Sequence, residues 1–477
     1  MAYTVDQQPA FTAMPAGTDW IYAVYDSVNN PSNRYKFKYI VEIYAGYSTG
    51  TIYVGMFKFS PNSTDRGIIN ISDILEQYFS STNLGSIFTG IESSFKGVDN
   101  IAGSECPIHC IDRLSLNTNS CDKIKLRFGK EYSNYPNVSP NQYLGDVTID
   151  ELFTFNAVAY NNEAVVSAGN YGLDIGNWDN KSFYNLNNKS YLLTDAPANS
   201  IYGQFIGEDD YATLAFLAGD FGGSAMSTPN LYNIAWFDAA GVSTGSTIST
   251  TVNASNGGKD MNSIGTIQNG EYHMQFIGVG IANFKGAGFT IPSDWASYTV
   301  TLFNTTGTTV QVSKPYNYFK QDADCKGFEK IRLTWLNKYG AWDYYNFTKK
   351  NIASTDITRV SYDKVKGNYN GEKFVKYGYE RGRATLNNRA VQTMSLNSDW
   401  FRNDEEAAWL EQLFISPEVY ILKGYDVTDT APADFGHYMI PVTVTNKRYD
   451  KYTEANDKVA QYNLDIEYAI DKRIQRG

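Results

Sequence analysis

The sequence predicts a mainly β protein, built of several antiparallel β-sandwiches with a few short helices. Apolar and polar residues alternate strictly in segments such as 35–43, 123–128, 330–335 and 462–468. This period of two places one face of a strand on a core and the other in water. The chain also holds 37 Tyr, 26 Phe and only 14 Pro, a composition that suits pleated sheets.

Two hairpins are expected from these alternating segments. Residues 298–302 and 309–312 flank a short loop that contains Gly307, which is a hairpin signal. Residues 53–59 are expected to pair in the same way with residues 35–44.

Helical periodicity is confined to two segments, residues 72–79 and residues 403–415. In each, apolar residues recur at the spacing of one helical face. Asn403 and Glu406 resemble a capping box at the start of the second segment, and Pro417 follows its end.

The length of 477 residues suggests three domains at roughly 150 residues each. We expect an N-terminal β-sandwich over residues 1–150 and a loop-rich β domain over 151–320. A C-terminal β domain over 321–477 would contain the short helix at 403–415. The middle domain is rich in Asn, Gly, Ser and Thr, which favour loops.

Composition limits the classes of partner. The chain has 40 Lys and Arg against 51 Asp and Glu, a net charge of −11. A uniform nucleic-acid binder would be basic, and an acidic chain is a poor match for an anionic membrane surface. No window of about 18 apolar residues predicts a membrane span. With four Cys and no secretory signal at its start, the protein is expected to be made and assembled in the cytoplasm.

One cysteine cluster is a candidate metal site. Cys106, His109, Cys110 and Cys121 supply three thiols and an imidazole, the ligand types that zinc prefers. Structural zinc sites usually combine two short Cys-containing turns, and the spacing of these four residues supplies only one of them. Free thiols at strand ends are the alternative, and on that interpretation the protein has no metal or cofactor.

Catalytic patterns are few. Gly-x-Ser-x-Gly occurs around Ser48 and around Ser243, but a nucleophile elbow needs a following helix, and both copies are better explained as loops. His109, His273 and His437 lie far apart in sequence. The acidic runs 208–210 and 404–406 are typical of a solvated surface and a helix start, so we predict no catalytic residues.

Four aromatic residues near the start of the third domain have two interpretations. As exposed rings they would form a sugar-binding platform, whereas as buried rings they would belong to a core or a subunit interface. They are Trp335, Trp342, Tyr344 and Tyr345.

Several stretches together resemble a known group of proteins. They are residues 34–79, 127–132, 331–347, 409–420 and 441–447. These stretches resemble virion structural proteins of tailed bacteriophages, particularly of phages that infect Bacteroidetes-type hosts. The resemblance covers the two ends of the chain and brings no active-site residues with it.

The resemblance implies a non-enzymatic structural component of the virion, in the tail, baseplate or collar. Its expected partners are copies of itself in a symmetric homo-oligomer and other virion proteins, after assembly in the host cytoplasm. One alternative is a fibre or spike protein that binds a host surface glycan through the middle domain. Another is a glycan hydrolase, which requires two carboxylates across a cleft. On the first hypothesis the terminal domains carry assembly and the middle faces outward.

Overall fold

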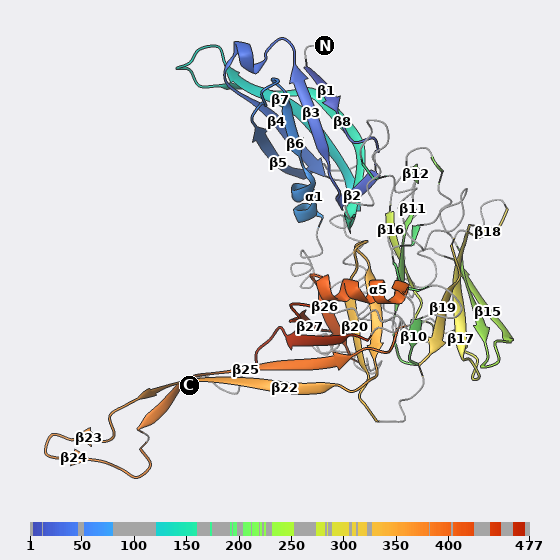
Figure 1. Ribbon diagram of the computed structural model, residues 1–477, viewed down its shortest axis with the longest axis vertical. Helices are drawn as coiled ribbons and strands as arrows, with labels where there is room; N and C mark the ends of the chain where they lie inside the picture. The colour runs from blue at the N-terminus through green and yellow to red at the C-terminus, as the bar shows by residue number, and fades with distance from the viewer. Residues whose placement is uncertain are drawn as a thin grey trace, which may run out of the picture. The chain divides into compact units, whose positions relative to one another are not determined.

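The structure of the protein is a computed structural model (Figure 1). It describes residues 3–11, 13–45, 52–79, 121–159, 172–173, 191–192, 194–197, 204–210, 212–218, 220–221, 224–225, 231–251, 273–281, 284, 289–304, 308–311, 313–321, 327–380, 382–401, 404–423, 439–449 and 461–472. These residues belong to two compact units. The first comprises the chain up to Gln321 together with Leu336–Asp343, and the second holds Asp322–Trp335, Tyr344–Gly424 and Ala433–Gly477.

The mainly β prediction is confirmed, and the elements of residues 3–158 already show it. In chain order they are β1 (Tyr3–Gln7), β2 (Ala13–Gly17), β3 (Ile21–Asp26), the short 3-10 helix η1 (Pro31–Asn33), β4 (Tyr35–Ala45), β5 (Ile52–Phe59), β6 (Gly67–Asn70), α1 (Ser72–Tyr78), β7 (Cys121–Ser133) and β8 (Asn141–Val158).

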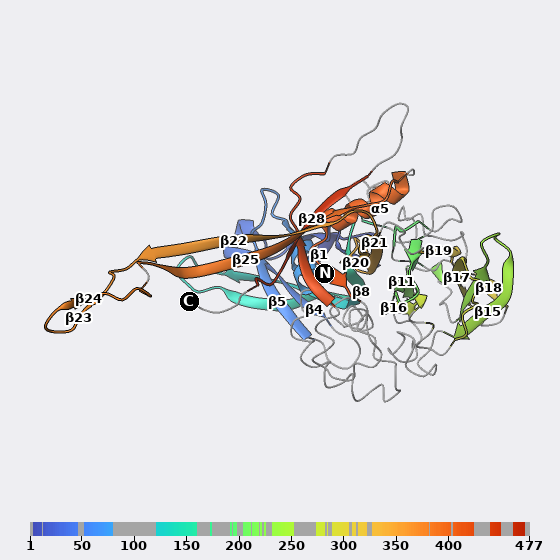
Figure 2. The ribbon, with the colours of Figure 1, turned by 90° about the horizontal axis from the view of Figure 1, so that it is seen from below.

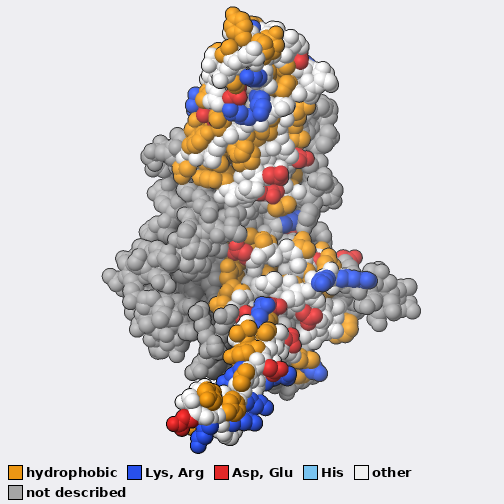
Figure 3. Space-filling view, turned by 90° about the vertical axis from the view of Figure 1, so that its left-hand side faces the viewer, with side chains coloured by type: hydrophobic (Ala, Val, Ile, Leu, Met, Phe, Trp, Pro, Cys, Tyr) orange, Lys and Arg blue, Asp and Glu red, His pale blue; other side chains and the backbone are white. Residues whose placement is uncertain are grey.

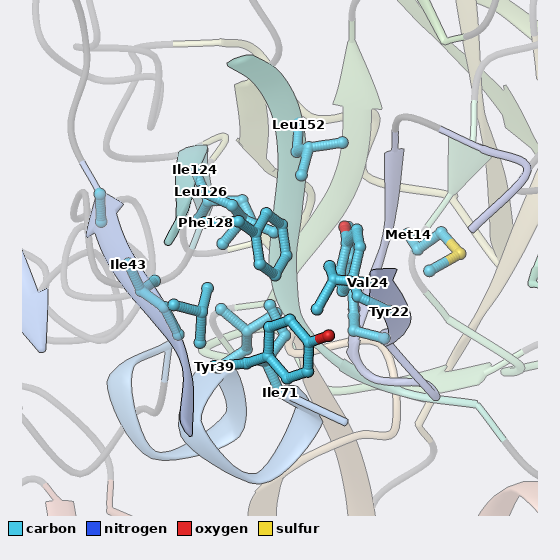
Figure 4. Packing of buried hydrophobic residues seen from close by; sticks show 14 of the residues in the cluster. Met14, Tyr22, Val24, Tyr39, Ile43, Ile71, Ile124, Leu126, Phe128 and Leu152 are labelled. Carbon is cyan, nitrogen blue, oxygen red and sulfur yellow. The ribbon is translucent and has the colours of Figure 1, made fainter. Parts of the chain in front are cut away.

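These elements form a β-sandwich. One sheet has the order β2-β8-β7-β4-β5 and the other the order β1-β3-β6. All pairings are antiparallel except that of β2 with β8. The side chains that alternate inward from both sheets meet in one core (Figure 4). There, the ring of Tyr22 on β3 lies 5.4 Å from that of Phe128 on β7.

Polar contacts complete this sandwich. The hydroxyl of Tyr3 on β1 donates to the carbonyl of Gly129 on β7 at 3.1 Å, which joins the two sheets. The Lys130 ammonium donates to the fully buried carboxylate of Asp26. Burial opposes the charge on Asp26, but hydrogen bonds from Lys130 and from the backbone N–H groups of Asn29 and Val28 outweigh it and hold its pKa below the usual value.

The remaining strands of the first unit form smaller sheets. They are β9 (Tyr191–Leu192), β10 (Gln204–Ile206), β11 (Thr213–Ala218), β12 (Asp220–Phe221), β13 (Ser224–Ala225), β14 (Leu231–Phe237), β15 (Ser243–Thr251), β16 (His273–Gly278), β17 (Ser297–Asn304), β18 (Val310–Gln311) and β19 (Tyr316–Lys320). The largest sheet has the order β10-β19-β17-β14-β15, with β18 paired to β17. Its core is aromatic, because the buried ring of Trp236 lies within 6 Å of those of Phe284, Trp295 and Tyr298.

Most of the second unit is one seven-stranded sheet, although Leu336, Trp342 and Asp343, at the ends of two of its strands, belong to the first unit. Its elements are β20 (Ile331–Leu336), β21 (Trp342–Phe347), β22 (Ile352–Asp363), β23 (Asn368–Tyr369), β24 (Phe374–Val375), β25 (Arg383–Asn397), α5 (Asp404–Ile415), β26 (Val419–Leu422), β27 (Met439–Val444) and β28 (Asn463–Tyr468). The strand order is β21-β20-β26-β27-β28-β25-β22, and β23 pairs only with β24.

Helix α5 packs on part of this sheet. The ring of Trp409 on α5 lies 5.3 Å from that of Trp335 on β20. Leu410 and Leu413 of the same helix are fully buried, as are Leu464 and Ile466 of β28. These apolar side chains give the sheet a covered face where α5 lies.

The local predictions can now be compared with the structure. The β4–β5 hairpin forms as expected, and α1 and α5 occupy the two predicted helical segments. A hairpin also joins β17 and β18, but β18 pairs with Phe303 and Asn304 and not with residues 298–302. One expectation fails on β20, where the polar side chains Arg332 and Thr334 are buried instead of facing water. Arg332 tolerates burial because its guanidinium donates to Asn346 at 2.8 Å and lies over the ring of Tyr344. The division into three domains remains a prediction.

Candidate functional site

The proposed zinc ligands lie almost wholly outside the described residues. This applies to Cys106, His109 and Cys110, while Cys121 begins β7 without a described side chain. Among the described residues, no group of three or more His, Cys, Asp or Glu side chains is placed to hold a metal ion. The zinc hypothesis therefore stays a prediction.

The candidate catalytic residues do not form a site within the described part of the chain. Ser48, His109 and His437 lie outside it, and His273 on β16 has no described side chain. Ser243 is exposed at the start of β15, in a turn where the Asp238 carboxylate accepts from the backbone N–H of Val242 at 2.8 Å. A strand, not a helix, follows Ser243. Its Gly-x-Ser-x-Gly pattern is thus a hairpin turn.

The acidic runs have structural partners. Asp210 is buried and accepts a hydrogen bond from the backbone N–H of Gly207 at 2.6 Å. Glu208 pairs with Lys320 at 2.7 Å. In the second run, Asp404 begins α5, where a negative charge suits the helix dipole.

The four aromatic residues of the possible sugar platform belong to the core. Trp335, Trp342 and Tyr344 are buried. The hydroxyl of Tyr345 donates to the Asp399 carboxylate at 3.2 Å and accepts from its backbone N–H at 2.9 Å. Burial raises the pKa of Tyr345 well above its usual value. Trp335, Tyr344 and Tyr345 belong to the second unit and Trp342 to the first, and the four rings offer no exposed platform.

The most prominent exposed feature is a long β-hairpin, residues 352–397, which we call the arm. β22 and β25 pair from Ile352↔Ser395 to Asp363↔Arg383. β28 pairs with β25 only over Thr393–Asn397. From residue 389 of β25 outward, β22 is the one strand paired with it among the described residues, so the arm leaves the sheet as a two-stranded ribbon (Figures 1 and 2).

The base of the arm is fastened by the segment that follows β28. The backbone N–H of Lys472 donates to the carbonyl of Ala390 at 3.0 Å, and Arg389 pairs with Asp471 at 2.8 Å. Beyond this point no described element covers either face of the ribbon, and every residue of β22 is exposed. The exposed residues include large apolar ones, namely Ile352, Ile357, Val360, Tyr362 and Leu386.

The tip of the arm, residues 364–382, is ordered by turns. The Asn370 carboxamide oxygen accepts from the backbone N–H groups of Glu372 and Lys373, and Gly371 has a φ of +100° that suits a tight turn. Pairing of β23 with β24 extends from this turn. Tyr377 and Tyr379 stack with ring centroids 5.4 Å apart, and Tyr379 is 81 % exposed.

The arm is basic in an acidic chain. It carries eight of the 40 Lys and Arg and only four of the 51 Asp and Glu, so its net charge is +4 and that of the remainder is −15. In Figure 3, basic and hydrophobic side chains lie side by side on the arm. Whole-chain charge conceals this local reversal, and for that reason the sequence predictions missed the arm. The Asn370-Gly371 pair was the signal that could have identified its turn.

Comparisons with known proteins supply no relative. No protein-family model matches the chain, and no curated protein matches it. Of the helices that the structure describes, none has the length and apolar character needed to cross a membrane. The candidate site therefore rests on the geometry and charge of the arm.

Proposed function

We propose that the protein is a non-enzymatic structural component of a tailed-phage virion, in the tail, baseplate or collar, and that the arm joins it to neighbouring subunits. The arm is the observation that carries this proposal. A two-stranded hairpin with no cover is at best marginally stable in water, and this one leaves large apolar side chains exposed along its length. Contact with another subunit would remove those side chains from water.

The position of β22 also supports the proposal. β22 is the last strand of its sheet, and no described strand pairs with its outer side, so the backbone groups there could pair with a strand of another chain. Monomeric proteins usually protect such edge strands, because an unprotected edge can pair with a strand of another molecule. A 12-residue edge strand suits addition of a partner strand.

The test is incorporation into particles of the phage that encodes the chain. In the variant for this test, an Asn-Gly turn replaces residues 359–388 and joins Thr358 to Arg389, which are paired across the hairpin. The Arg389–Asp471 pair at the base is thereby kept. We expect the wild-type chain in purified particles and the variant to be lost from them or to block their assembly. Absence of the wild-type chain from particles would refute the proposal.

A second candidate function is recognition of a host surface glycan at the tip. The stacked, exposed rings of Tyr377 and Tyr379 favour it, since flat aromatic faces pack well on the apolar faces of sugars. Under this alternative, particles that carry Tyr377→Ala and Tyr379→Ala would assemble normally and lose adsorption to the host. Under the first proposal the same double substitution weakens incorporation of the chain into particles, and the particles that do form adsorb to the host normally.

A further inference from the structure

The contrast in charge within the chain is large enough to identify a partner. The arm has a net charge of +4 and the rest of the chain −15. Any second copy of the chain thus presents an acidic body to a basic arm. Opposite potentials of this kind speed association and set which surfaces meet.

The basic groups at the tip are available for such a contact. Lys364, Lys366, Lys373 and Lys376 form no ion pair with any carboxylate among the described residues. The nearby pair Arg383–Asp363, at 3.1 Å, is about three-quarters exposed on both sides. Since the tip also exposes Tyr369, Phe374 and Tyr379, a docked surface would bury apolar area between the charges.

We propose that the arm docks on the acidic body of a second copy of this chain, an inference that rests on the proposed function as an assembly protein. The lysines of the tip meet carboxylates of the neighbouring copy, and the exposed apolar side chains of the arm are buried in the same contact. The neighbour supplies a cover that no described part of its own chain gives the two-stranded ribbon.

This arrangement has a consequence for symmetry. The arm and the acidic body are different surfaces of one chain, so each copy is able to donate its arm to one neighbour and receive an arm from another. Contacts of this head-to-tail type close into rings when the rotation between copies allows it.

The first experiment measures the oligomeric state of the purified full chain by sedimentation velocity. At about 0.15 M NaCl we expect an oligomer, and at about 1 M NaCl a dissociation constant at least about tenfold larger, because the screening length falls from about 8 Å to about 3 Å. Changing all four tip lysines to Glu should abolish the oligomer at the lower salt concentration. A matched control changes four exposed lysines outside the arm to Glu and should leave it intact: Lys36, Lys38, Lys423 and Lys447.

The second experiment locates the contact. Isotopically light and heavy copies are mixed and treated with a carbodiimide, which joins lysines to carboxylates in direct contact. The inference requires light-to-heavy crosslinks between tip lysines and carboxylates outside the arm. Crosslinks confined to single copies, a monomer at every salt concentration, or an oligomer that survives the four-lysine change would each overturn it.

Two further outcomes separate this inference from the proposed function. If the chain is monomeric but the arm is needed for incorporation into particles, the partner is a different virion protein, and only the inference fails. If the chain does not self-associate and the four-lysine change abolishes its binding to an acidic polysaccharide such as polygalacturonate, the arm recognises glycans instead. Absence from particles refutes the proposed function itself.

Discussion

The N-terminal sandwich and the arm are made of the same kind of strand and end in opposite environments. β4, with 11 residues, and β22, with 12, both belong to antiparallel pairs. Tyr39 on β4 is fully buried, whereas Tyr362 on β22 is 48 % exposed. The two regions differ in whether a second layer of structure packs over the strand pair. The sheet β1-β3-β6 covers β4, but no described element of the second unit covers the outer part of β22 (Figures 1 and 2).

This contrast indicates that the aromatic residues of the sandwich and those of the arm have different roles. Where a strand pair has a cover, its aromatic side chains contribute to the stability of the fold. Where it has none, the same residue types add little to folding and remain available for a partner. Substitutions in the two regions should therefore differ in their effect on the free energy of unfolding.

The largest difference is expected between Phe128→Ala and Tyr362→Ala. Phe128 is fully buried in the sandwich core, so its removal leaves a cavity and should lower the free energy of unfolding by about 3–5 kcal/mol. Tyr362→Ala on the arm should change it by less than about 0.5 kcal/mol. Urea denaturation of the purified variants measures both. Equal losses would show that the arm is packed in the free protein.

The second comparison concerns ion pairs. Lys130→Met leaves the buried carboxylate of Asp26 without its cation and should cost about 3 kcal/mol of unfolding free energy. Arg383→Met breaks the exposed pair with Asp363 and should cost less than about 1 kcal/mol. Both are measured by denaturation at neutral pH. A loss at Arg383 that matches the loss at Lys130 would contradict the exposed state of the arm.

The smallest effect concerns the helix that covers the seven-stranded sheet. Burial raises the pKa of Glu406 on α5 to about 7. Between about pH 5 and pH 7 the folded state therefore keeps a proton that the unfolded state releases, so stability falls as the pH rises through this range and levels off once Glu406 ionises in the folded state too. Because Glu406 is partly exposed, we expect a fall on the order of 1 kcal/mol after allowance for solvent screening.

Substitution of Glu406 checks this assignment. Glu406→Gln should reduce the difference in unfolding free energy between pH 5 and pH 8, measured by denaturation at both pH values. Glu372→Gln, at an exposed position on the arm, is the matched control. If both variants keep the wild-type difference, Glu406 is not its source.

The local fold was largely predictable because its signals are short in sequence. The alternation in residues 35–43 predicted β4, and the periodicity of residues 403–415 predicted α5. The arm was missed because the whole-chain charge conceals its basic character, and because no pattern within residues 352–397 shows that a second layer is absent. The burial of Arg332 was also missed, because its partners Asn346 and Tyr344 are brought to it by an adjacent strand.

By itself the sequence determined the mainly β class, the alternating segments and the two helical segments, because period and capping are properties of neighbouring residues. Only the tertiary structure decided which strands are covered. Tyr39 became core because another sheet packs over it, while Tyr362 became surface because no described element packs over the outer part of β22. Whether a second layer packs over a strand depends on contacts between residues far apart in the chain, and these contacts cannot be predicted from local sequence patterns.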